Sequence, residues 1–161
     1  MRNLLFVVIL TLAVTLPAFA AVEPGQAQGT LTVGSDKIPL TYAYAINHQK
    51  NEFSNRKDDI RVVITNKPLD ATTDLANIDY SFPDGVYGIV VCIDRNHVPS
   101  HVAVQHQSGM FDAGFFGPGD DYGFKGVADG NHVEGTFTSK TITTSTTKFT
   151  FDVAVNAAIR K

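Results

Sequence analysis

Residues 86–93 constrain the fold more than any other stretch of the chain. They read Val-Tyr-Gly-Ile-Val-Val-Cys-Ile, so an extended strand here carries apolar side chains on both of its faces. Such a strand needs cover on both sides, and we predict that it lies in the middle of the core. The breaker residues 82–85 precede it, and the polar residues 94–96 that follow predict a hairpin with a strand over 98–104.

The first twenty residues predict a secretory signal peptide. Arg2 is followed by an apolar run over 4–16 and by small alanines at positions 18 and 20. The run is shorter than the roughly 20 residues that a membrane-spanning helix needs, and Pro17 ends it. We therefore expect cleavage before Ala21, a secreted or periplasmic location, and no membrane span after cleavage.

Residues 21–161 are enough for one domain and too few for two. Residues 21–28 combine proline, glycine and glutamine and predict a flexible linker, so the domain is expected to begin at Gly29. The 16 acidic residues outnumber the 13 basic ones and no basic stripe is present, which argues against a nucleic-acid partner. Cys92 is the only cysteine, which excludes an intrachain disulfide. Its apolar neighbours in the sequence predict a buried, unreactive thiol.

The spacing of apolar residues predicts the remaining strands. Polar and apolar residues alternate over 30–33, 38–46, 60–65, 124–128, 132–137 and 149–155. With 86–93 and 98–104 these make about eight strands, which predicts an all-β fold, a single antiparallel β-sandwich or barrel. Asp70 is a suitable N-cap and predicts one short helix near Ala71–Asn77. Residues 105–126 contain six glycines and are expected to be the longest irregular segment.

Three segments resemble an uncharacterised family of small secreted bacterial β-domain proteins. They lie within Gly29–Leu69 and read Gly-Thr-Leu-Thr-Val, Ile-Pro-Leu-Thr-Tyr-Ala-Tyr-Ala and Ile-Arg-Val-Val-Ile-Thr-Asn-Lys-Pro-Leu. The resemblance rests on strand patterns, so it implies a bacterial envelope or secreted setting and no functional residue.

Three histidines, His97, His101 and His106, cluster in the sequence and are the candidate metal ligands. On one strand His97 and His101 would share a face but lie about 13 Å apart, given a rise of about 3.3 Å per residue. Metal–nitrogen bonds of about 2 Å cannot span that distance. We therefore interpret both as solvent-facing histidines and expect no cofactor.

An aromatic and glycine-rich segment over 109–126 is the candidate binding loop. Its candidate ligand-binding residues are Phe111, Phe115, Phe116 and Tyr122. Glycines let a ligand approach the backbone, and aromatic rings offer stacking surface. The alternative is that these rings plug one end of the fold. The threonines between 136 and 147 are interpreted as a solvated strand face.

Catalytic signatures are weak in this sequence. Ser100 and Ser108 lie near histidines but not in a nucleophile elbow. We therefore expect a non-enzymatic protein that binds a small ligand or an envelope component through its loops. The alternatives are a β-barrel carrier of an apolar ligand and a small metal-dependent enzyme. The shape of the fold distinguishes a carrier from the expected binding domain, because a carrier needs a closed barrel with an open apolar cavity.

Overall fold

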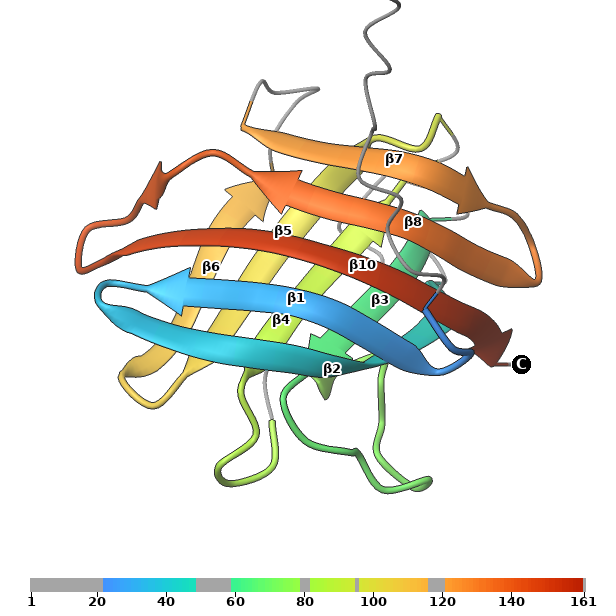
Figure 1. The fold of residues 1–161 in the computed structure, drawn as a ribbon, viewed down its shortest axis with the longest axis horizontal. Coiled ribbons are helices and arrows are strands. Elements are labelled where there is room, and N and C mark those ends of the chain that lie inside the picture. The colour runs from blue at the N-terminus through green and yellow to red at the C-terminus, as the bar shows by residue number, and fades with distance from the viewer. Residues whose placement is uncertain (1–21, 49–58, 79–81, 95, 116–120, 161) are drawn as a thin grey trace, which may run out of the picture.

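The computed structural model describes residues 22–48, 59–78, 82–94, 96–115 and 121–160. They form ten strands of one sheet, shown in Figure 1. The strands are β1 (Gln26–Val33), β2 (Asp36–His48), β3 (Asp59–Thr65), β4 (Gly88–Ile93), β5 (Pro99–His106), β6 (Gly109–Phe115), β7 (Tyr122–Ala128), β8 (His132–Ser139), β9 (Ile142–Thr143) and β10 (Lys148–Arg160). The prediction of an all-β, mainly antiparallel fold is confirmed.

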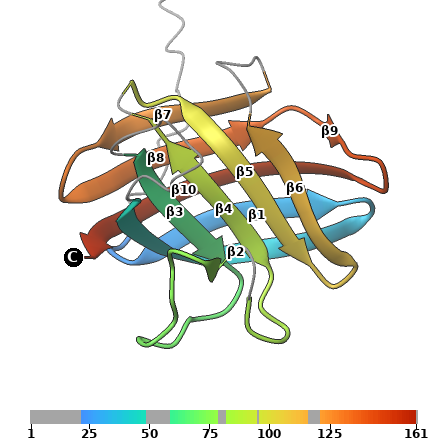
Figure 2. The same ribbon diagram turned by 180° about the vertical axis from the view of Figure 1, so that it is seen from behind.

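The strand order is β6-β5-β4-β3-β2-β1-β10-β8-β7, with β9 attached to β10. Most neighbours in the sheet are also neighbours in the chain, and β1 pairs with β10 along its whole length. The sheet bends so that β1, β2, β10, β8 and β7 form one layer, and β3 to β6 cross behind it in Figure 1 and in front of it in Figure 2. Its ends, β6 and β7, are not paired with each other, so the sheet is not closed.

The main core lies between these two layers. Side chains from both layers are almost fully excluded from solvent there, among them Leu31, Leu40, Ile64, Ile89, Phe137 and Phe149. Burial of this much apolar surface is the dominant favourable contribution to folding.

The prediction for 86–93 is confirmed, because all six residues of β4 are buried. Ile89, Val91 and Ile93 face the main core. Val90 faces the opposite way, into a second cluster that we call the outer core. The outer core is closed by the segments 66–78 and 82–87, which contribute Leu69, Leu75, Ile78 and Val86. The predicted hairpin between 86–93 and 98–104 is also present, as β4 and β5.

The helix predicted near Ala71–Asn77 is wrong, because these residues form turns. The Asp74 carboxylate accepts hydrogen bonds from the Ala76 N–H at 2.9 Å and from Asn77 Nδ2 at 2.8 Å. Arg61 Nη1 donates to the Ala76 carbonyl at 2.8 Å. Short polar side chains and a buried guanidinium thus take up the backbone groups that a helix would pair internally.

Two other sequence expectations need correction. Residues 105–126 are not mainly irregular, because Gly109–Phe115 forms β6 and pairs with β5. The domain begins before Gly29, because β1 starts at Gln26 and Ala27 is buried. The glycines of this stretch have low strand propensity, so the sequence does not predict β6. The strand forms because β5 supplies hydrogen-bond partners for its backbone.

Candidate functional site

The structure separates the three candidate metal ligands. His97 Nε2 donates a hydrogen bond to the Ala128 carbonyl at 2.8 Å, and His101 Nε2 donates to Asp112 Oδ1 at 3.1 Å. His106 lies between Ser108 and Asp36. In the described part of the chain, no three His, Cys, Asp or Glu side chains come together as a metal ion requires.

His101 is buried, which corrects its placement on a solvent-facing surface. Only 8% of the residue is exposed, because β6 pairs with β5 beside it and brings Asp112 into contact with its ring. Cys92 is buried as predicted, but its surroundings are not only apolar. Its cross-strand neighbours are Arg61 of β3 and His101 of β5. The sequence hid these neighbours because they are 31 and 9 positions away.

The four candidate ligand-binding aromatic residues lie in different environments, and not all of them are described. Phe111 is half-buried against the main core and also lines a pocket. Tyr122 stacks on Phe151, with ring centroids 6.1 Å apart, and burial, aided by the carboxylates of Asp121 and Asp112, raises the pKa of its hydroxyl. Phe115 lies opposite His101 in the strand register, and its side chain is outside the description. Phe116 lies outside the described residues.

The pocket that Phe111 lines has a volume of about 440 Å³ and lies between β6 and the loop that joins β9 to β10. Its lining residues are Ser108, Met110, Phe111, Asp112, Thr144, Ser145 and Thr146. Four of them carry hydroxyl groups and one carries a carboxylate. We call it the β6 pocket.

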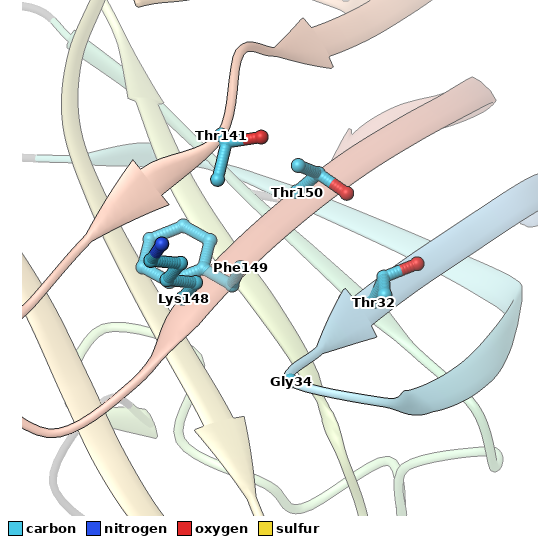
Figure 3. A pocket seen from close by; sticks show the side chains of 6 residues that line it. All are labelled: Thr32, Gly34, Thr141, Lys148, Phe149 and Thr150. Atoms are coloured by element: carbon cyan, nitrogen blue, oxygen red, sulfur yellow. The ribbon is translucent and has the colours of Figure 1, made fainter.

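A second pocket, of about 310 Å³, lies on the other side of the β9–β10 region and is shown in Figure 3. Its lining residues are Thr32, Gly34, Thr141, Lys148, Phe149 and Thr150. Thr32 and Thr150 are cross-strand partners of β1 and β10, so their side chains lie on the same face of the sheet. We call it the β10 pocket.

Both pockets lie at the end of the molecule where the β1–β2 turn, the β5–β6 turn and the β9–β10 loop gather, on the left in Figure 1. We call this the hydroxyl-rich end. Thr141, Thr144 and Thr146 line these pockets, although the sequence favoured a solvated strand face for them. The abundance of threonine between 136 and 147 was the only sequence signal for these pockets. It does not distinguish a pocket wall from an exposed strand face, because both are rich in threonine.

A third pocket, of about 290 Å³, lies near the other ends of the strands, where the β4–β5 and β7–β8 turns approach each other. Its lining includes Asp94, His97 and Asp129. His97 has a positive φ of 62°, and its ring meets the edge of Phe124 at a centroid distance of 6.3 Å. The β4–β5 turn thus contacts Phe124, which belongs to β7 and lies within the predicted binding loop 109–126.

No helix among the described residues has the length and apolar character needed to span a membrane. No protein-family model, curated protein or solved structure matches this chain.

Proposed function

We propose that this protein is a secreted or periplasmic β-domain that binds a saccharide at its hydroxyl-rich end. One observation carries this proposal: two neighbouring pockets flank the β9–β10 loop, and hydroxyl side chains make up about half of their lining. The lining also includes two aromatic residues, Phe111 and Phe149, and two charged residues, Asp112 and Lys148.

Saccharides match this set of groups. A Ser or Thr hydroxyl both donates and accepts hydrogen bonds, as each sugar hydroxyl does, and a carboxylate accepts from two of them. Apolar side chains can pack against the C–H face of a sugar ring. The volume of the β6 pocket, about 440 Å³, is within the range of roughly 300–1,000 Å³ typical of small-molecule sites.

The alternative of a carrier for an apolar ligand has less support. A carrier holds its ligand between the layers of the sheet, and that space contains the close-packed side chains of the main core. The pockets of the hydroxyl-rich end open at the rim and are lined by many polar groups. These features favour a surface-bound polar ligand.

Binding to an array of bacterial envelope saccharides tests the proposal. Asp112→Asn should weaken binding about tenfold or more, because a hydrogen bond to a charged group is worth about 1.5–3 kcal/mol. Asp84→Asn is the matched control, since Asp84 is exposed in a turn and lines neither pocket. A protein that binds no saccharide, or an Asp112→Asn variant that binds as tightly as wild type, would contradict the proposal.

Export is tested separately. Residues 1–21 fused to a reporter should carry it across the bacterial inner membrane, and the exported protein should begin at Ala21. Mass spectrometry of the exported material gives the N-terminus directly. An uncleaved chain held in the membrane would contradict this location.

A further inference from the structure

Where β5 ends and turns into β6, a histidine lies in contact with a serine, and a carboxylate from β2 lies beside the histidine. His106 Nδ1 lies 2.7 Å from Ser108 Oγ, and His106 Nε2 lies 3.3 Å from Asp36 Oδ2. Asp36 is the first residue of β2, 70 positions earlier in the chain. Nucleophilic catalysis uses this arrangement: the nucleophile is hydrogen-bonded to a base, and a third group orients the base.

The hydrogen bonds determine which nitrogen of His106 carries the proton. The Ser108 backbone N–H donates to Nδ1 at 3.3 Å, so Nδ1 is the nitrogen with the lone pair. The neutral ring therefore carries its hydrogen on Nε2, which lies 3.3 Å from the carboxylate oxygen Oδ2 of Asp36. In this tautomer Nδ1 can accept the Ser108 hydroxyl proton, which is what a general base must do.

A nucleophile that reacts with a bound molecule must be accessible to it, whereas the base behind the nucleophile can be buried. His106 is buried, with 5% of the residue exposed, whereas Ser108 is exposed and lines the β6 pocket. The Ser108 hydroxyl is also not needed to hold the turn in place. Gln107 Nε2 donates a hydrogen bond to Asp36 Oδ2 at 3.1 Å, which links the β5–β6 turn to the start of β2 without the Ser108 hydroxyl.

We propose that Ser108 is a nucleophile for acyl transfer from a carboxylic ester bound in the β6 pocket. Ser108 Oγ attacks the ester carbonyl while its proton passes to His106 Nδ1, and this proton then leaves with the alcohol as the ester C–O bond breaks. Water, deprotonated by the same nitrogen, then attacks the acyl-serine. The bond between the acyl carbon and Ser108 Oγ breaks, the proton passes from Nδ1 to Oγ, and a carboxylic acid is released. Asp36 is a positioning residue that holds the ring in the reactive tautomer. This activity goes beyond saccharide binding and does not depend on it.

A fluorophosphonate tests the nucleophile without any knowledge of the natural ester. Its phosphorus–fluorine bond breaks as Ser108 Oγ bonds to phosphorus, fluoride leaves, and His106 takes the proton. The intact folded protein is allowed to react and is then digested, and mass spectrometry of its peptides should find the adduct on Ser108. Ser108→Ala should remove it with little change in melting temperature. Ser139→Ala is the control and should leave it unchanged, because Ser139 lines neither the β6 pocket nor the β10 pocket.

Asp36→Asn separates catalysis from turn geometry. Its labelling should be about 100-fold slower or more, the scale of general-base assistance, and the dependence of the rate on pH should change with it. Failure of Ser108 to react while a known serine hydrolase reacts in the same tube would overturn the proposal, as would equal rates for Asp36→Asn and wild type. Saccharide binding measured on the same samples reports on the proposed function independently.

Discussion

Two glycines allow neighbouring strands to approach more closely than a side chain permits. A Cβ added to Gly88 would lie 2.1 Å from the Ile64 carbonyl oxygen of β3, and one added to Gly29 would lie 2.2 Å from the Asp152 carbonyl oxygen of β10. Both obstacles are backbone atoms within the sheet, so they cannot move aside as a flexible side chain does. At these two positions any side chain larger than hydrogen would clash with the neighbouring strand, so glycine is required.

Gly88→Ala should therefore destabilise the protein by about 1–3 kcal/mol, the usual cost of overpacking. The melting temperature should fall by several degrees. Gly130→Ala is the control, because nothing lies within 4 Å of its added Cβ and its φ is not positive. Equal melting temperatures for the two variants, measured by circular dichroism, would refute the close approach of β3 and β4.

The described part of the connection between β3 and β4, residues 66–78 and 82–87, is the element that turns a half-exposed strand into a buried one. It covers the outer face of β3, β4 and β5, and Ile78 at its centre is fully buried. Arg61 of β3 ties it down through the Ala76 carbonyl, and Tyr44 of β2 through its hydroxyl, which accepts a hydrogen bond from the Leu69 N–H. The two-sided burial of β4 therefore depends on an element without regular structure.

Stability of this segment should depend on pH through Asp74. Hydrogen bonds from the Asn77 side chain and the Ala76 N–H favour the charged carboxylate and lower its pKa in the folded protein. A group whose folded pKa is lowered contributes stability above its unfolded pKa, and the contribution is lost as pH falls through the folded value. Carbon-detected NMR titration should show the lowered pKa in wild type and an ordinary one in Asn77→Ala. An ordinary value in both would contradict the Asx turn.

At the scale of the whole molecule, the two turns 94–97 and 129–131 bring distant parts of the open sheet together. His97, in the β4–β5 turn, binds the Ala128 carbonyl at the end of β7 and contacts Phe124 in the same strand. The ends of the strand order, β6 and β7, are not paired with each other. This side-chain bridge thus joins the two layers where strand pairing does not.

His97 stabilises the bridge while its backbone carries strain, since its φ is 62°. His97→Ala removes the ring and keeps a side chain in the left-handed region, whereas His97→Gly removes the ring and relieves the strain. Both variants should be less stable than wild type, and His97→Ala should be about 1 kcal/mol less stable than His97→Gly. Urea denaturation measures both differences. A His97→Ala variant as stable as wild type would show that the ring does not join the layers.

The sequence alone determined those features that depend on residues close together in the chain. Two-faced apolar character placed β4 in the core, alternation predicted six further strands, and the polar residues 94–96 predicted the hairpin of β4 and β5. Periodicity and turn chemistry act over a few residues, so a single sequence is enough to recognise them.

Only the tertiary structure decided features that depend on register between distant segments. It paired the glycine-rich β6 with β5, placed Arg61 and His101 beside Cys92, and brought Asp36 to His106 and Ser108. In the sequence Ser108 had only a nearby histidine, because its orienting carboxylate is 72 positions away. Such contacts follow from how the bent sheet packs on itself, and local pattern carries no record of that packing.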